Sequence, residues 1–320
     1  MLIACFMKLI NNSTNWQNSY SLLDLLIYLC FSVFFAELTL NRLIIMQTHI
    51  TKDENSGHKL NYANIPYYWK VISTSVSGSD HEISGVSCQD ANFYKILRNK
   101  ILVSAVADGA GSAVMGDIGA KIAVQSAVKS VRIKSSEISK LNDEKWKEIL
   151  IGSFKSAQVV IEKEAKEKGM TVRDFATTLS LVIAYPGFVA AGQVGDGAII
   201  LAENENLIAL TKPQNGEYIN ETTFIVLPDA LDTIQIEFWH GTFTHIATIS
   251  DGLQMLALKM PEHVPYEPFF MPLFRFISNA KEIEAQEQLT NFLRSQRVRE
   301  RTTDDLTMFL ATLIQNNKQA

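Results

Sequence analysis

Hydrophobic residues recur at two spacings along the chain, and the spacing separates expected strands from expected helices. Short runs rich in β-branched residues, several of them divided by tight-turn sequences such as Pro186-Gly187, predict strands. Apolar residues at near-helical spacing with a charged outer face predict helices. The expected strands are Lys70–Ser77, Ile101–Ala107, Thr177–Ala184, Phe188–Val194, Ala198–Ala202, Phe224–Leu227, Thr233–Phe238, Phe243–Ile249 and Leu306–Leu313. The expected helices are Gly116–Arg132, Trp146–Lys168, Gly252–Leu258 and Lys281–Arg294.

The order of these elements indicates the fold class. Two helices lie between early strands, many hairpin-spaced strands follow, and later helices precede a last strand. This order favours an α+β fold in which helices cover antiparallel sheets, rather than a βαβ series. We therefore expect one domain of catalytic size over residues 66–315, preceded by an N-terminal extension over residues 1–65.

The N-terminal extension contains an apolar segment, residues 22–46, that differs from the rest of the chain. Its uncharged run Leu25–Ala36 has 12 residues, fewer than the roughly 20 that a spanning helix needs. A signal peptide fits poorly, because Lys8 is the only early positive charge. A membrane anchor, a packed helix and residues translated from an over-extended start all stay open. The polar segment after Met46 favours Met46 as the start and a cytoplasmic protein; a membrane-anchored protein is the alternative.

Composition and charge exclude several classes of protein. With 320 residues, 47% of them hydrophobic and 20% charged, the chain has the composition of an ordinary globular protein. Cys5, Cys30 and Cys88 are too few and too scattered for a disulfide framework or a thiolate zinc site. The formal net charge of −5 argues against a protein that coats nucleic acid. The function must therefore be sought in the motifs.

Acidic residues stand at the ends of the expected strands. They are Asp90, Asp108, Asp196, Asp251, Asp304 and Asp305. Three precede glycine, which lets the backbone turn sharply and approach a ligand. If the strands lie side by side, the carboxylates gather and repel one another unless cations neutralise them. Oxygen ligands favour Mg²⁺ or Mn²⁺ over zinc, and two such ions can clamp a phosphoryl group and supply hydroxide for attack.

Six motifs carry a family resemblance. They are Ser87-Cys88-Gln89-Asp90-Ala91, Val106-Ala107-Asp108-Gly109-Ala110-Gly111, Ala176-Thr177-Thr178-Leu179, Gln193-Val194-Gly195-Asp196-Gly197, Ile249-Ser250-Asp251-Gly252 and Thr303-Asp304-Asp305-Leu306-Thr307. In this order they resemble the metal-dependent PPM (PP2C-like) serine/threonine protein phosphatases, particularly the bacterial branch, over about Ser75–Leu313. The resemblance implies a four-layer α-β-β-α sandwich of two antiparallel sheets flanked by helices.

The implied activity is hydrolysis of phosphoserine and phosphothreonine in proteins by water activated at a dinuclear Mn²⁺ or Mg²⁺ site, with room for a third ion. The implied partner is a phosphorylated protein substrate, opposing a serine/threonine kinase, and we expect a monomer. The alternative is a decayed relative that binds phosphoprotein or regulates a partner without catalysis.

The resemblance also implies a role for each acidic residue. Asp108 resembles the carboxylate that bridges both ions, with the Gly109 carbonyl on one of them. Asp251 and Asp304 resemble ligands of the other ion, and Asp90 is similar to the residue that holds metal-bound water. Asp108 and Asp251 are therefore the expected catalytic carboxylates.

Two further aspartates lie in these motifs. Asp196 resembles the position that, with Asp251, can hold a weaker third metal, although Gly-Asp-Gly between strands is also a hairpin signal. Asp305 is expected to act behind the ligands rather than as one. The aromatic stretch Tyr266–Phe276, where the family carries a variable flap, fits either substrate recognition or core packing.

Three positions depart from the family pattern. Gln89 stands where many members have Glu, and Gly85 stands where many have a phosphate-gripping arginine. Ala110 replaces the histidine that is thought to protonate the leaving group in eukaryotic members. These departures motivate the decayed-module alternative. His81 is the nearest candidate for phosphate contact or proton donation, because imidazole titrates in the useful range.

Overall fold

A computed structural model describes residues 67–315, apart from residues 99, 134–140, 204 and 215–221. The expected extension over residues 1–65, with the apolar segment 22–46 and Met46, lies outside the described residues. Among the helices of the described ranges, none combines the length and the apolar character needed to cross a membrane.

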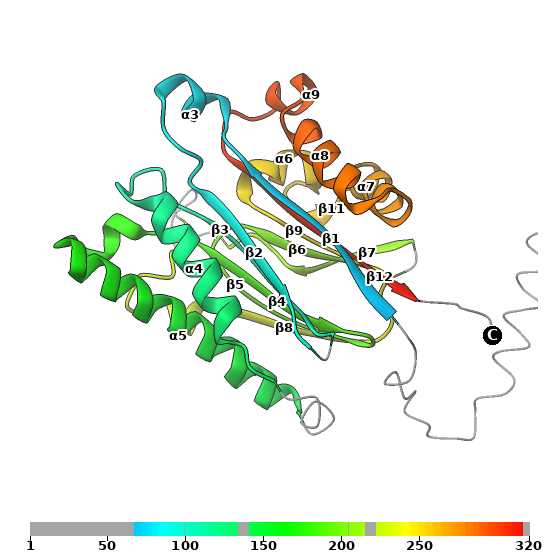
Figure 1. Cartoon of the computed structure of the whole chain (residues 1–320), viewed down its shortest axis with the longest axis horizontal. Coiled ribbons are helices and arrows are strands. Elements are labelled where there is room, and N and C mark those ends of the chain that lie inside the picture. The colour runs from blue at the N-terminus through cyan, green and yellow to red at the C-terminus, as the bar shows by residue number, and fades with distance from the viewer. Residues whose placement is uncertain (1–66, 99, 134–140, 204, 215–221, 316–320) are drawn as a thin grey trace, which may run out of the picture. The chain divides into compact units, whose positions relative to one another are not determined.

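Two five-stranded antiparallel sheets form the centre of the domain (Figure 1). The first has the order β2 (Asp90–Ile96), β3 (Leu102–Asp108), β4 (Leu179–Tyr185), β5 (Phe188–Val194) and β8 (Gln235–His240). The second has the order β1 (Tyr67–Val76), β12 (Leu306–Gln315), β9 (His245–Ile249), β6 (Ala198–Glu203) and β7 (Asn206–Thr211). A small hairpin, β10 (Leu258–Lys259) and β11 (Val264–Pro265), stands apart from both.

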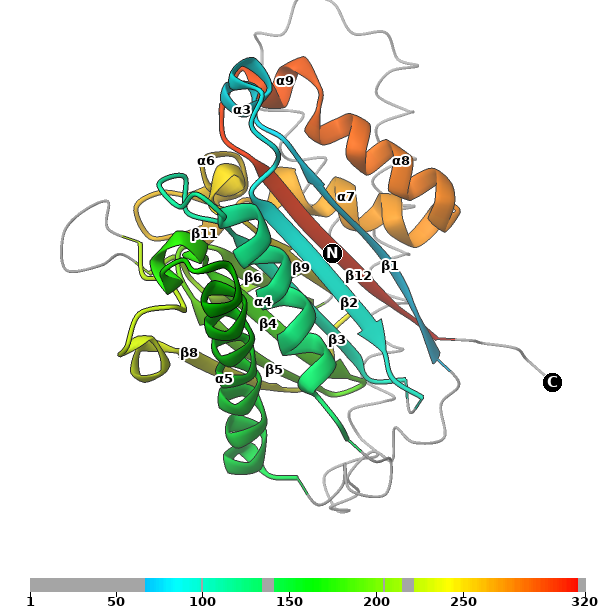
Figure 2. The ribbon, with the colours of Figure 1, turned by 60° about the vertical axis from the view of Figure 1, so that its left-hand side comes forward.

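Helices cover the outer face of each sheet, which confirms the predicted four-layer sandwich (Figures 1 and 2). On the first sheet lie α4 (Gly116–Ser130) and α5 (Asp143–Lys168); on the second lie α7 (Glu267–Asn279) and α8 (Glu282–Leu293). Short elements complete the domain: α3 (Ser79–Ser84), η3 (Val172–Phe175), η4 (Ala230–Thr233), η5 (Asp251–Leu253), α6 (Gln254–Ala257) and α9 (Gln296–Arg299).

Three apolar layers hold the sandwich together, because successive residues of a strand point to opposite faces of its sheet. In β3, Val103 and Ala105 pack under α4 and α5, whereas Leu102 and Val106 face the other sheet. The third layer lies between the second sheet and α7 and α8, where Phe274 is fully buried. A strand buried on both faces lacks apolar–polar alternation, which explains the continuous apolar runs in the sequence.

Several predicted elements are wrong in detail. Phe224–Leu227 is a turn rather than a strand: the Ile225 N–H donates to the Thr177 carbonyl at 2.9 Å, and the Ile225 side chain is buried. The predicted helix Gly252–Leu258 is only the turn η5 followed by one turn of α6. In both segments the apolar residues pack beside the segments that carry the carboxylates, and they do not form the regular element that was predicted.

The aromatic stretch Tyr266–Phe276 forms most of α7, with its most buried aromatic rings in the core. Pro268 is tolerated there because it lies in the first turn, whose N–H groups have no partner within the helix. Pro272 stands inside the helix, and proline normally argues against a helix. This is why α7 was not predicted. The strands β2 and β7 were missed for another reason: both are only partly buried and carry mixed polar and apolar residues.

Candidate functional site

Three carboxylates meet where strands of both sheets end. One oxygen from each of Asp108, Asp196 and Asp251 lies within 4.8 Å of the others. Asp108 ends β3 of the first sheet, and Asp251 follows β9 of the second. Asp196 lies in the turn that carries the chain from β5 in the first sheet to β6 in the second. The group therefore spans the seam between the two sheets.

Asp108 is fixed by two threonines that precede β4. The Asp108 N–H donates to Thr178 Oγ1 at 2.9 Å. The Asp108 carbonyl accepts both the Thr177 hydroxyl and the Thr178 N–H, each at 2.8 Å. The predicted strand from Thr177 thus begins two residues later, at Leu179. The two threonines before it are not part of the strand and hydrogen-bond the backbone of Asp108. Sequence reasoning missed this role, since the contact joins residues about 70 positions apart.

Asp196 sits on a turn that glutamine side chains fix from several sides. Gly195 adopts a φ of 110°, a conformation that suits glycine. Gln193 is fully buried, and its Nε2 donates to the carbonyls of Gly195 at 3.2 Å and Gly197 at 2.8 Å. From the segment after Asp251, Gln254 Nε2 donates to the Asp196 carbonyl at 2.7 Å. The Gln254 side chain therefore joins the segment after Asp251 to the backbone of Asp196.

The positioning role of Gln193 was not predicted from the sequence. A single polar residue inside the apolar strand Phe188–Val194 is, however, a signal that its side chain has hydrogen-bond partners in the core. Its Oε1 accepts the Thr211 hydroxyl at 2.6 Å and the Ser180 hydroxyl at 3.2 Å. Every polar atom of this side chain is thus used inside the core. A fully used buried amide of this kind specifies one local conformation.

Replacing Gln193 with Met should weaken divalent-metal binding and lower stability together. The apolar side chain leaves the carbonyls of Gly195 and Gly197 without their buried donor, and each such loss costs about 1–3 kcal/mol. Calorimetric titration with Mn²⁺ and thermal unfolding measure the two effects. The control is Gln286→Met, which removes side-chain hydrogen bonds to the Ser73 backbone and none of the contacts that hold the carboxylates. Unchanged Mn²⁺ binding in Gln193→Met would contradict the positioning role.

Asp90 lies beside this group. It opens β2 directly opposite Asp108 in the β2–β3 ladder, and only 3% of it is exposed. Its Oδ2 accepts the Ser250 hydroxyl at 2.7 Å. Its Oδ1 has no hydrogen-bond partner among the described residues.

The electrostatics of the metal-free carboxylates are unfavourable. Burial, followed by the charges of Asp90 and Asp251, raises the pKa of Asp108 well above its usual value. Burial likewise raises the pKa of Asp90 to about 8 and that of Asp251 to about 6. Burial also raises the pKa of Asp196. Ionised carboxylates at neutral pH therefore need a compensating positive charge.

The donor set fits hard divalent cations. Besides Asp90 Oδ1, Asp196 Oδ1 and Gln89 Oε1 are buried acceptors without a hydrogen-bond partner in the described structure. All are oxygen atoms, the ligands that Mg²⁺ and Mn²⁺ prefer. The thiol of Cys88 is a poor ligand here, because burial and then the neighbouring carboxylates raise its pKa far above its usual value.

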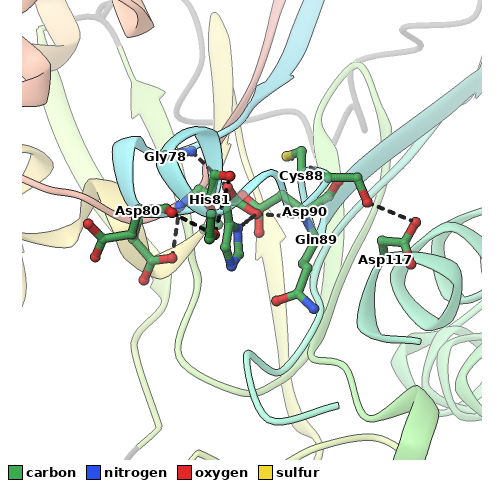
Figure 3. A network of polar contacts seen from close by, with 12 residues as sticks. Gly78, Asp80, His81, Cys88, Gln89, Asp90 and Asp117 are labelled. Carbon is green, nitrogen blue, oxygen red and sulfur yellow. Dashed lines mark hydrogen bonds and ion pairs between the residues drawn. The ribbon is translucent and has the colours of Figure 1, made fainter. Parts of the chain in front are cut away.

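The remaining predicted site residues are Asp304, Gly109 and His81. Asp304 is exposed and is not among the three carboxylates that meet; its Oδ1 accepts the Asp305 N–H at 2.8 Å. Gly109 is paired with Thr177 by an isolated bridge at the end of β3. His81 lies in α3, next to the segment that carries Gln89 and Asp90 (Figure 3). Its Nδ1 lies 2.9 Å from Asp305 Oδ2.

Comparisons with known proteins agree with this picture. The family model described as Protein phosphatase 2C matches residues 77–294. Serine/threonine-protein phosphatase 3 of Escherichia coli K12 is 34% identical over 252 residues, which cover 76% of this chain and 98% of that protein.

Solved structures share the fold at lower identity. A bacterial serine phosphatase superposes with a TM-score of 0.58 at 13% identity, covering 78% of this chain and 100% of the other. The catalytic domain of the serine/threonine protein phosphatase PstP, in complex with two manganese ions, superposes with a TM-score of 0.53 at 12% identity, covering 78% and 100%.

Proposed function

This chain belongs to the protein phosphatase 2C family, and from that premise we propose that it hydrolyses phosphoserine and phosphothreonine in proteins with Mn²⁺ or Mg²⁺ as cofactor. The observation that carries the proposal is the meeting of Asp108, Asp196 and Asp251 within 4.8 Å, at a site with oxygen atoms that no described residue hydrogen-bonds. The name of the Escherichia coli relative supports the substrate class.

Asp108, Asp196 and Asp251 would hold the cations, with Asp90, Asp304 and the Gly109 carbonyl as further ligands. When bound, two divalent ions neutralise the charge on the phosphoryl group and activate the attacking water. The chain's own contribution is to hold its carboxylates in register across two sheets, through the threonine and glutamine contacts above. Asp90 and Gln89 each offer an acceptor that has no hydrogen-bond partner among the described residues and can orient a water molecule.

An assay of the full chain, stripped with a chelator, tests the function. We expect hydrolysis of a phosphothreonine peptide and of p-nitrophenyl phosphate to return when Mn²⁺ is added. Zn²⁺ and Ca²⁺ at the same concentration serve as controls for nonspecific metal effects. Mn²⁺ binding without turnover of either substrate would contradict catalysis and favour a phosphoprotein-binding role. Neither binding nor turnover would leave only the fold.

Finer aspects of the activity stay predictions. We propose an opposing serine/threonine kinase, a monomer, a cytoplasmic location and a catalytic domain over residues 66–315. Titration calorimetry reports whether a third ion binds, and light scattering after size exclusion reports the oligomeric state.

A further inference from the structure

Asp305 is a buried hub that ties three segments together. Its side chain is 2% exposed, yet its carboxylate accepts three hydrogen bonds. Oδ1 accepts the Gly78 N–H at 2.7 Å, and Oδ2 accepts the Gln89 N–H at 2.6 Å and His81 Nδ1–H at 2.9 Å. This set fixes the carboxylate, and the carboxylate in turn fixes the imidazole ring of His81.

The hub is joined to the metal-site segments on two sides. The Asp305 N–H donates to Asp304 Oδ1. The Gln89 carbonyl accepts the Gly109 N–H at 3.1 Å, so the backbone of Gln89 links Asp305 to the residue that follows Asp108. A Cβ at Gly252 would overlap the Asp305 carbonyl oxygen, so the hub also packs directly against the turn after Asp251.

The two ring nitrogens of His81 differ in their contacts within the described part of the chain. With Nδ1–H directed at Asp305, Nε2 has no hydrogen-bond partner in the described part of the chain, and the side chain is 23% exposed. Figure 3 shows this nitrogen pointing away from the polar network, on the side to which Gln89 also points. A carboxylate bonded to Nδ1–H fixes the orientation of the ring, and in the protonated ring Nε2 carries a transferable proton.

Docking of α3 does not depend on His81. The Asp80 N–H donates to the Thr303 carbonyl at 3.2 Å, and Asp80 Oδ2 accepts the Thr303 hydroxyl at 2.7 Å. Glu82 also pairs with Arg299 at 2.6 Å. The His81–Asp305 contact is therefore not needed merely to hold the helix, and variants at His81 should fold.

The reaction needs a proton at the oxygen that leaves phosphorus. A seryl or threonyl oxygen leaves phosphorus as a strongly basic alkoxide unless it is protonated. The other described histidines are placed elsewhere: His240 pairs with Asp143, the half-buried His245 lies 2.9 Å from the Ser278 hydroxyl, and His263 lies between β10 and β11. The charged groups around His81 are Asp80, Glu82, Arg299, Asp304 and Asp305.

We propose that Asp305 is a positioning residue that holds His81 as the proton donor to the leaving seryl or threonyl oxygen, an inference that rests on the proposed function. The bond between phosphorus and the leaving oxygen breaks as the bond to the water oxygen forms. The water releases one proton to solvent, His81 Nε2 gives its proton to the leaving oxygen, and solvent then reprotonates His81. The products are the free hydroxyl and hydrogen phosphate, so atoms and charges balance.

Comparing two leaving groups tests the assignment. The p-nitrophenolate ion is stable without a proton, whereas the threonyl oxygen is not. In His81→Gln we expect kcat for the phosphothreonine peptide to fall about 100-fold, the usual size of general-acid catalysis. The kcat for p-nitrophenyl phosphate should stay within about threefold. Asp305→Asn should show the same selective loss, and the double variant should be no worse than His81→Gln.

Glu82→Gln is the matched control, since it removes a tie between α3 and α9 without touching His81; both substrates should keep their rates. Equal losses on both substrates in His81→Gln would overturn the inference, as would additive losses in the double variant. If Asp305→Asn does not fold, Asp305→Glu replaces it: selective loss on the peptide supports the positioning role, and unaltered peptide turnover overturns it. Mn²⁺ titration of His81→Gln and of Glu82→Gln should give unchanged affinity. Failure of the unsubstituted protein to turn over either substrate would instead refute the proposed function.

Discussion

Replacing Asp108 with Asn should abolish Mn²⁺-dependent turnover while leaving the metal-free protein at least as stable as before. Partners that merely orient metal ligands already matter by 10–100-fold, so loss of the central carboxylate should lower kcat by at least about 100-fold. The stability result follows from burial and from the charges of Asp90 and Asp251, which make an ionised carboxyl at position 108 unfavourable without metal. A neutral amide of the same shape relieves that repulsion.

Thermal unfolding with chelator and with excess Mn²⁺ measures both parts of this prediction. The unsubstituted protein should gain stability from Mn²⁺ by mass action, and Asp108→Asn should gain little. Asp232→Asn, at an exposed aspartate in η4, is the matched control and should behave as the unsubstituted protein does. Normal turnover in Asp108→Asn, or a large drop in its metal-free melting temperature, would contradict the role given to this carboxylate.

Raising the pH from 6.5 to 8 should destabilise the metal-free protein. The pKa of Asp90 is raised to about 8 in the folded state by burial, against about 3.9 in the unfolded chain. Between these values the folded state binds more protons than the unfolded state, so the free energy of unfolding falls as the pH rises, by up to about 1.4 kcal/mol per pH unit for one proton. The loss is complete above the folded pKa.

The pH window is chosen to avoid an opposing group. Burial lowers the pKa of His245 to about 4, so His245 reduces stability as the pH falls below about 6.5. Above pH 6.5 this contribution is absent, and the pKa of Asp251, about 6, has also been passed. Melting temperatures in chelator at pH 6.5, 7.25 and 8 give the slope. Asp90→Asn should reduce the slope, with Asp108, whose pKa is also raised by burial, contributing the remainder; a slope equal to that of the unsubstituted protein would contradict the contribution of Asp90. Bound Mn²⁺ should reverse the trend, because cations favour the ionised carboxylates.

Local sequence patterns predicted most strands and the main helices, because strands such as β3 and β5 are buried on both faces and leave long apolar runs. They failed where a distant contact decides the local conformation. Ile225 is apolar because it packs in the core, yet its backbone turns to reach Thr177. Helix α7 tolerates Pro272 in its interior while its aromatic residues pack on the second sheet.

In the functional site, too, local sequence patterns predicted the carboxylates but not the residues that position them. Aspartates before glycine pointed to Asp108, Asp196 and Asp251, and these three do meet. The residues that hold them were not visible, because Thr178, Gln193 and Gln254 act through contacts with segments elsewhere in the chain or with backbone atoms. Likewise, Asp305 shows its connection to His81 only when β12 lies beside β1 and brings positions 224 residues apart together.

The position of β12 in the second sheet has a consequence for folding during synthesis. This strand lies between β1 and β9, yet it is the last described strand to leave the ribosome. Until it arrives, β1 and β9 each present an unpaired edge, the kind of surface that recruits other chains. The segment just before it also carries Asp304 and Asp305. Nascent chains released before β12 would therefore lack the strand that joins β1 to β9, and they would also lack Asp304 and Asp305. Such a prematurely terminated product should aggregate rather than act as a weakly active enzyme.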